Sequence, residues 1–206
     1  MKVLLTGHTG YIGTVLAPML REAGHAVIGL DTDFFAGCDF NGSVAHVPAI
    51  RKDLRDVTAA DLQDFDAVIH LAALSNDPLG DLNRDCTYDI NHRASVRLAQ
   101  LAKSAGVRRF LFSSSCSLYG LAAGDGLLSE EAAFNPVTPY GESKVFVEQE
   151  VSRVADDSFS PTFLRNSTAY GVSPRLRADL VVNNLLGFAY NTAEVVVASD
   201  GTPSRA

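Results

Sequence analysis

Lys2-Val-Leu-Leu-Thr6 runs directly into Gly7-His8-Thr9-Gly10-Tyr11-Ile12-Gly13, and these two stretches decide the fold. The first is a short apolar run of the kind that forms a buried parallel strand. The second is a glycine-rich turn, and the apolar periodicity of residues 11–23 predicts a helix behind it. A strand, a glycine turn and a helix in this order are typical of the start of a doubly wound α/β domain.

Each glycine of the turn has a predicted role. Gly7 permits a tight turn, Gly10 lets backbone amides approach a pyrophosphate, and Gly13 lets the helix pack closely on the strand. The helix amino terminus adds the positive end of its dipole. The G-x-x-G-x-x-G spacing is one residue longer in its first gap than the usual fingerprint, so a plain loop is the alternative. We expect a dinucleotide site formed by Gly7, Thr9, Gly10, Tyr11, Ile12 and Gly13.

A second predicted strand, residues 26–30, ends at Asp31. In dinucleotide-binding folds a carboxylate at this place binds the adenosine ribose hydroxyls. With Asp33 nearby and no Arg or Lys between residues 31 and 37, a 2′-phosphate would be repelled, so NAD is favoured over NADP. The alternative is that Asp31 merely begins a turn.

The length, composition and net charge limit the classes of protein to which the chain can belong. A chain of 206 residues, 47% of them hydrophobic, fits one α/β domain with a substantial core. A net charge of −7 without a Lys/Arg-rich run argues against a nucleic-acid partner. Neither a leader nor an apolar span of membrane length is visible, so we expect no membrane association and a cytoplasmic location. The three cysteines lack metal-ligand spacing, which predicts reduced thiols and no metal site.

Further strands and helices are predicted to alternate along the chain. The expected fold is therefore α/β, a doubly wound parallel sheet (Rossmann) with its ligand outside the strand carboxyl ends. Strands are expected at residues 44–47, 67–71, 109–113, 162–165 and 195–198, and helices at residues 82–105, 139–155 and 176–190, the first of these ending at Gly106.

Tyr140 and Lys144 lie one helical turn apart and follow a serine run, Ser113-Ser114-Ser115. A tyrosine pKa near ~10 makes a poor base at neutral pH, and a neighbouring ammonium favours the phenolate. Such a phenolate can remove a hydroxyl proton while Ser115 donates a hydrogen bond to the same oxygen. The alternatives are an exposed Tyr/Lys pair and a serine run that only ends a strand. Together with the glycine turn, the pattern favours nicotinamide-dependent oxidation of a carbinol.

At this point the chain resembles the extended short-chain dehydrogenase/reductase family, in particular the branch of nucleotide-sugar epimerases and dehydratases that includes UDP-galactose 4-epimerase. The resemblance spans essentially all of the sequence. It is carried by residues 6–13, Asp53-Leu-Arg-Asp56, His70-Leu-Ala-Ala73, Asn91, residues 113–120, Tyr140-Gly-Glu-Ser-Lys144 and Leu164-Arg165-Asn166.

The resemblance implies a role for each matching position. Asp53 and Leu54 would contact the adenine region, while Leu71, Ala72 and Ala73 would line the coenzyme, with Asn91 supporting the core beside them. Ser115, Tyr140 and Lys144 would be catalytic, the last two also touching NAD. Ser115, Cys116, Ser117 and Asn166 would touch a nucleotide-sugar substrate.

The resemblance also implies the reaction: NAD oxidises a sugar hydroxyl, and the fate of the keto-sugar distinguishes the members. Epimerases return the hydride to the other face, and this outcome is our first expectation. The 4,6-dehydratases use carboxylates where this chain has Cys116 and Ser117, which disfavours ordinary dehydration. Cys116 is expected to be a buried packing residue, with an acid role in an unusual elimination or epimerisation as the alternative. An atypical dehydratase, a reductase and a non-catalytic NAD-binding module also stay open.

Domain organisation completes the expectations. We expect an NAD-binding Rossmann domain over residues 1–170 and the start of an incomplete substrate region over residues 171–206. Members of the family usually continue into a smaller domain that clamps the sugar nucleotide, and here the substrate domain is expected to be truncated at Ala206. Members also commonly pair through the helices matching residues 82–105 and 139–155, which implies a homodimer.

Overall fold

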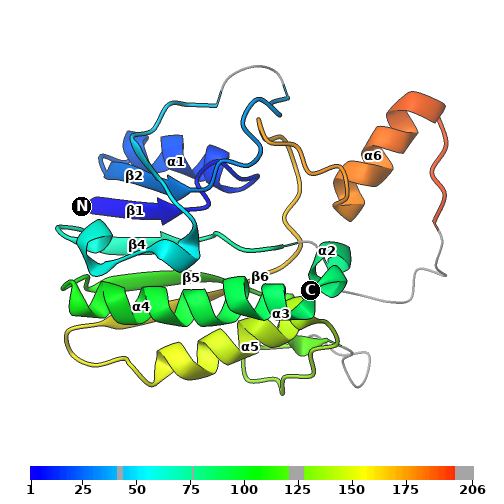
Figure 1. Ribbon diagram of the computed structural model, residues 1–206. Coiled ribbons are helices and arrows are strands. Elements are labelled where there is room, and N and C mark those ends of the chain that lie inside the picture. The colour runs from blue at the N-terminus through cyan, green and yellow to red at the C-terminus, as the bar shows by residue number, and fades with distance from the viewer. Residues whose placement is uncertain (41–43, 76, 121–127, 198–206) are drawn as a thin grey trace.

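A six-stranded parallel sheet forms the centre of the protein in the computed structural model, which describes residues 1–40, 44–75, 77–120 and 128–197 (Figure 1). The order β3-β2-β1-β4-β5-β6 is that of doubly wound dinucleotide-binding folds, so the predicted fold class is confirmed. The strands are β1 (Lys2–Thr6), β2 (Ala26–Asp31), β3 (Ala49–Arg51), β4 (Ala67–His70), β5 (Arg109–Ser115) and β6 (Ser160–Asn166).

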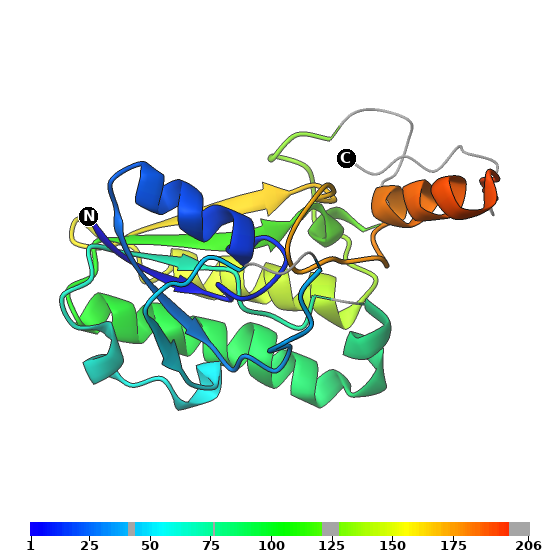
Figure 2. The same ribbon diagram turned by 90° about the horizontal axis from the view of Figure 1, so that it is seen from above.

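Helices cover both faces of the sheet (Figure 2). On one face lies α1 (Gly13–Glu22), and on the other lie α4 (Ala94–Ser104) and α5 (Pro139–Ser152). Because neighbouring residues of a strand point to opposite faces, Leu4 enters the larger core and Leu5 the smaller one. The larger core includes Val68, Phe110 and Phe112 of the sheet, Leu98, Ala99 and Ala102 of α4, and Val147 and Val151 of α5.

The strand predicted at residues 44–47 is wrong in position. Residues 44–48 form no regular structure, and the paired strand is β3. Val47 is buried beside α1, but the pairing with β2 begins only where Gly29 donates to the Pro48 carbonyl at 2.8 Å. Proline has no N–H to give to a ladder, so the strand starts after it.

The single helix predicted over residues 82–105 is divided. α2 (Asp77–Leu82) ends before Asn83, whose extended backbone breaks the helix and whose side chain accepts from the Cys86 amide at 3.0 Å. The chain then continues through α3 (Arg84–Thr87), a π-helical turn η3 (Tyr88–Arg93) and α4. Helix α4 stops two residues before Gly106, whose φ of +83° suits the predicted capping role. An N-cap residue has a non-helical backbone, so Asn83, which caps α3, cannot continue α2.

Apart from the strand predicted at residues 195–198, the remaining predicted elements keep their type but shift at their ends. Three short 3₁₀ turns, η1 (Leu54–Asp56), η2 (Ala59–Leu62) and η4 (Cys116–Tyr119), complete the domain. The strand predicted at residues 195–198 is absent from residues 195–197, and Ala198 lies outside the described residues. In the described part of the chain no helix is long and apolar enough to cross a bilayer.

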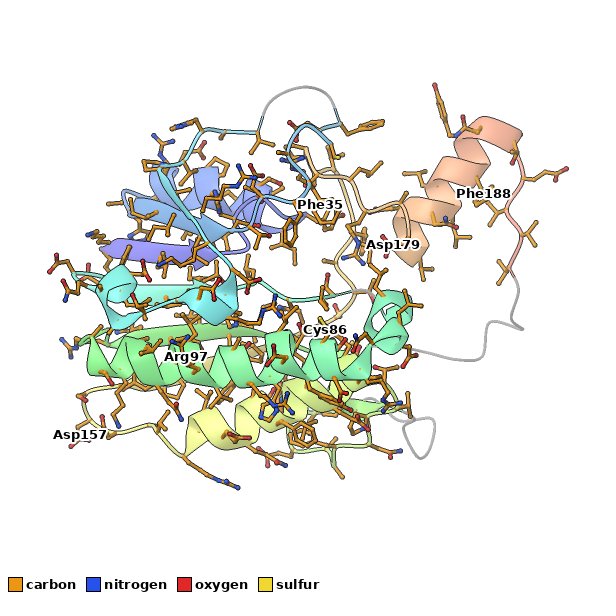
Figure 3. All side chains as sticks on the ribbon, viewed as in Figure 1. Phe35, Cys86, Arg97, Asp157, Asp179 and Phe188 are labelled. Carbon is orange, nitrogen blue, oxygen red and sulfur yellow. The ribbon has the colours of Figure 1, made fainter. Side chains whose placement is uncertain are left out.

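The chain after β6 leaves the body of the domain. Residues 167–180 run past the carboxyl end of the sheet to α6 (Val181–Thr192), which has no buried residue and lies apart from the sheet (Figure 1). Figure 3 shows Phe188 on this helix, away from the two cores. The predicted helix at residues 176–190 therefore starts five residues later, after the segment has made its contacts with the glycine turn.

Candidate active site

The glycine turn lies at the carboxyl end of β1, next to the point where the chain order of the sheet reverses between β1 and β4. Gly7 has φ +73°, and a Cβ there would lie 2.8 Å from the Ala72 nitrogen. A Cβ on Gly13 would lie 2.1 Å from the Gly7 carbonyl oxygen, which demonstrates the close packing of α1 on the turn. The turn thus has the bare backbone and the helix amino terminus that a pyrophosphate requires.

Asp31 ends β2 beside this turn. Its carboxylate accepts from the Thr9 amide at 3.2 Å and from the Asp33 amide at 3.0 Å. Asp31 is therefore the last residue of β2, and its bond to the Asp33 amide also begins the turn that follows. It lies where the ribose of a dinucleotide is expected. A neighbouring histidine, His8, packs its ring over Gly29, and burial lowers the pKa of His8.

An arginine from far along the chain reaches this edge of the site, which the short window of residues 31–37 could not reveal. Arg175 lies 3.8 Å from Asp33 and 2.8 Å from Asp39, and it donates to the Phe35 carbonyl in the loop marked in Figure 3. Arg51 of β3 lies at the same edge, where its Nε donates to the Thr32 carbonyl at 3.3 Å. The carboxylates of Asp31, Asp33 and Asp39 still outnumber the two guanidiniums, so the edge keeps a negative balance. That balance agrees with a preference for ribose hydroxyls over a 2′-phosphate.

Two predicted coenzyme contacts follow β3. The Asp53 carboxylate caps η1 and is bound by Arg55 at 2.8 Å, and these hydrogen bonds to Arg55 hold the pKa of Asp53 below its usual value. The Leu54 side chain lies in the larger core, so only its backbone can face a coenzyme.

The loop after β4 forms the opposite wall. Residues 71–73, predicted to line the coenzyme, are partly buried there, and the Ala72 amide donates to the Thr6 hydroxyl at 3.2 Å. Asn91 on η3 binds both backbone groups of Leu74, at 2.8 Å and 2.9 Å. The predicted supporting role of Asn91 therefore has a concrete form, because its amide fixes the end of this loop.

The serine run ends β5 at the mouth of the sheet. The Ser115 hydroxyl oxygen accepts from the Ser117 amide at 3.1 Å, which leaves its O–H to donate. Asn166 is paired with Ser115 in the sheet and donates to the Ser113 hydroxyl at 3.1 Å. Cys116 is partly buried against a small cluster of Leu118, Tyr119 and Val145.

Tyr140 and Lys144 lie in the first turns of α5 and face this strand end. The Lys144 ammonium lies 5.3 Å from the centre of the Tyr140 ring and donates to the Ser113 carbonyl at 2.6 Å. The structure thus brings Tyr140, Lys144 and the serine run together. The lysine is only 3% exposed, so the alternative of an exposed surface pair does not hold for it.

Burial has a large effect on this lysine. Desolvation lowers the pKa of Lys144 to about 7, and Glu148 acts in the opposite direction. The Lys144 nitrogen also lies 4.5 Å from the centre of the Phe112 ring, an attraction that partly offsets the lost water. Its positive charge at neutral pH consequently depends on its neighbours.

Sequence reasoning missed a buried ionic network behind this lysine. Glu148, 5% exposed, accepts from Ser114 at 2.5 Å and pairs with Arg165 of β6 at 2.7 Å. Arg165 also donates to the Tyr119 hydroxyl at 3.0 Å. The available signal was the spacing of Tyr140, Lys144 and Glu148, which places the three on one face of a helix.

The segment after β6 folds back over the glycine turn. The Tyr11 hydroxyl donates to the Gly171 carbonyl at 2.7 Å and accepts from Asn183 at 3.1 Å. Ser173 donates to the Tyr11 carbonyl at 2.7 Å. The predicted coenzyme contacts of Tyr11 and Ile12 stay predictions. The Tyr11 side chain has a further role, because it ties the turn to this segment.

One further cation from this segment lies at the site. Arg177 donates to the Ser75 hydroxyl at 2.9 Å and is close enough to Tyr140 to interact with it electrostatically. Its hydrogen bonds to Asp179 raise the pKa of Arg177.

Comparison with known proteins gives the same assignment as the geometry. Residues 3–206 match the NAD dependent epimerase/dehydratase family. The chain belongs to this family. A UDP-glucose 4-epimerase of Streptomyces lividans is 33% identical over 159 residues, which cover 73% of this chain and 46% of that protein. NAD is the coenzyme of the epimerase/dehydratase family, and its members named here are enzymes.

Solved structures of the family are similar over most of the chain. One is MoeE5 in complex with UDP-glucuronic acid and NAD, with a TM-score of 0.78 and 31% identity over 91% of this chain and 61% of that one. Another is an NAD-dependent NDP-hexosamine 5,6-dehydratase of tunicamycin biosynthesis, with a TM-score of 0.83 and 28% identity over 97% and 65%. The chain therefore spans about half to two thirds of the length of these family members.

Proposed function

We propose that this protein is an NAD-dependent nucleotide-sugar epimerase that acts through a transient keto-sugar. The observation that carries the proposal is that the buried Lys144 joins Tyr140 to the end of β5, where Ser115 lies, at the same edge of the sheet as the glycine turn after β1. Family members that epimerise UDP-glucose or bind UDP-sugars support a nucleotide-sugar as the substrate class.

The chain's own residues divide the proton chemistry. Tyr140 as phenolate removes the proton of a sugar hydroxyl and returns it at the end of the cycle. The Lys144 ammonium stabilises that phenolate by charge. Ser115 donates a hydrogen bond to the reacting oxygen and fixes its position. NAD, when bound, supplies the acceptor and donor of the hydride.

Single-turnover incubation with UDP-, dTDP- and GDP-sugars followed by mass analysis tests the proposal. Because epimers have the same mass, the result that supports the proposal is a product of unchanged mass that separates from the substrate by chromatography. The Tyr140→Phe variant keeps the ring and removes only the hydroxyl, so we expect turnover to fall by at least about 100-fold, the usual contribution of a general base. If this variant keeps full activity, the catalytic assignment fails and a non-catalytic NAD-binding module is the better description.

Dehydration is the second candidate, because the 5,6-dehydratase is similar over nearly the whole chain. Against it, Cys116 packs into a small apolar cluster, and Ser117 adds no carboxylate that could act as an acid. A product lighter by one water in the same mass analysis would replace epimerisation by dehydration.

A further inference from the structure

Glu148 is a buried carboxylate that the proposed proton chemistry does not use. It lies on α5 one helical turn beyond Lys144, and both side chains point to the interior. Neighbouring residues of β5 hold the two: the Ser113 carbonyl accepts from Lys144, and the Ser114 hydroxyl donates to Glu148. The two charges are therefore fixed by the same strand.

Arg165 fixes the other side of the carboxylate. Its Nε lies 3.2 Å from each Glu148 oxygen and its NH2 group 2.7 Å from Oε2, which is a bidentate arrangement. The guanidinium also stacks on the Phe134 ring, with its carbon 4.8 Å from the ring centre. Removing Arg165 or Glu148 alone would leave a buried, uncompensated charge.

The charges around Lys144 conflict. On α5 it meets Tyr140 and Glu148, on β4 the buried His70, and beyond Glu148 the guanidinium of Arg165 on β6. His70 is neutral, because burial lowers its pKa to about 3. Burial favours a neutral lysine, and a bound nicotinamide cation would push in the same direction. The carboxylate of Glu148 is the negative charge that opposes both.

We propose that Glu148, held by Arg165 and Ser114, is a positioning residue that keeps Lys144 charged beside Tyr140 in a site where burial would neutralise it. Its importance for turnover rests on the proposed function. Its effect on Lys144 does not, because the protonation of a lysine is measurable without substrate.

The test is an NMR titration of the lysine side chains labelled with ¹³C at Cε. The chain has four lysines, at positions 2, 52, 103 and 144, and the Lys144 signal is assigned by its loss in Lys144→Arg. In Glu148→Gln we expect the titration midpoint of Lys144 to fall by about 1 to 3 pH units. Glu150→Gln is the matched control on the same helix, since Glu150 is outside the site and pairs with His92. It should leave the midpoint where it is.

A second variant covers the case in which Glu148→Gln does not fold. Glu148→Gln combined with Arg165→Met removes both buried charges together, which proteins tolerate better than loss of one partner. The proposal again expects a lower midpoint, because the carboxylate lies nearer to Lys144 than the guanidinium does. The fall should be smaller than in Glu148→Gln, because the loss of the Arg165 cation acts in the opposite direction. An unchanged Lys144 midpoint in a folded variant overturns the proposal and leaves Glu148 a structural residue.

Turnover is measured separately on the same variants. If Tyr140→Phe is fully active while Glu148→Gln lowers the Lys144 midpoint, the proposed function fails and the electrostatic role of Glu148 stands. If Tyr140→Phe is inactive and Glu148→Gln leaves the Lys144 midpoint unchanged, the proposed function stands and the electrostatic role of Glu148 fails.

Discussion

The buried residue His70 makes the stability of the fold depend on pH. Its ring bonds Thr6 at 2.7 Å and Ser95 at 2.8 Å, so it joins β4 to β1 and to α4. Burial lowers the pKa of His70 to about 3, so the folded protein holds it neutral. An unfolded chain binds a proton there below about pH 6.5. Stability is thus fully present above that pH and is lost as the pH falls toward 3.

We therefore expect the free energy of unfolding to decrease by up to ~1.4 kcal/mol for each pH unit below about 6.5 on account of His70. In His70→Gln this slope should flatten, although the variant is less stable at neutral pH because its bonds to Thr6 and Ser95 change. The slope does not vanish in His70→Gln, because burial also lowers the pKa of His8, which contributes a slope of the same sign. Urea unfolding between pH 7 and 4.5 measures it, with the exposed His46→Gln as control. Equal slopes in His70→Gln and wild type would contradict the assignment.

Gly13 is the residue with the least room in the glycine turn. Its substitution by alanine places a Cβ against the Gly7 carbonyl, so the turn must open. We expect Gly13→Ala to lose about 1–3 kcal/mol of stability and to bind NAD much more weakly. Gly187→Ala on α6 is the control, since a Cβ there meets no atom within 4 Å. Thermal unfolding and calorimetric NAD titration give both numbers, and tight NAD binding by Gly13→Ala would refute the placement of the coenzyme.

At the scale of elements, α5 determines the geometry of the reactive pair. Thr138 caps the helix by accepting from the Gly141 amide at 3.1 Å, and Pro139 occupies the first helical position. A Cβ on Gly141 would lie 2.8 Å from the Ser117 carbonyl, so the first turn of α5 touches η4 directly. The position of Tyr140 thus depends on a cap and on one close backbone contact.

Thr138→Ala should destabilise the protein by about 1 kcal/mol, because it leaves a helix amide without its partner. The first turn carries Tyr140, so turnover should fall more than the stability loss alone explains. Thr138→Ser keeps the capping oxygen and should behave as wild type. Chemical unfolding measures the loss of stability in the two variants, and steady-state kinetics measures the loss of turnover. Identical turnover in both would show that the cap does not affect the reaction.

At the scale of the whole molecule, the outer face of α5 carries a partly exposed aromatic cluster that lies outside the hydrophobic core. Phe146 is 39% exposed, and its ring lies 5.2 Å from that of His92 and 6.2 Å from that of Tyr88. These rings belong to the two helical regions through which family members are expected to pair. An aromatic patch of this kind is typical of an interface.

We predict a homodimer in solution, with a mass twice the 22.0 kDa of the chain by light scattering. Phe146→Asp should shift the mass to that of one chain. Dimer formation would bury an unpaired carboxylate at the centre of the interface, and the loss of its hydration opposes association. Phe188→Asp on the separate helix α6 should leave the dimer intact. A monomer in the wild type, or a dimer in Phe146→Asp, rules out this interface.

The parts of the fold that local pattern determines were predictable. The uninterrupted apolar run of β1 and the capping glycine at Gly106 gave the right element and nearly the right ends. Pattern failed where one residue changes the backbone partner: Pro48 delays β3, and Asn83 divides the helix before α4. Val195–Val197 have strand-like side chains but no neighbouring strand among the described residues, so propensity alone forms nothing there.

The order of residues along the chain is enough to specify the glycine turn, the alternation that leads to a parallel sheet, and the spacing that puts Tyr140 and Lys144 on one side of a helix. These are short-range properties, fixed within a few residues of the chain. The packing of distant elements is needed to bury Lys144, to bring Arg165 to Glu148 behind it, and to bring Arg175 to the loop after β2. The burial of a side chain and the charges near it depend on which distant strands become neighbours. Both of these set the free energy of an ionised group.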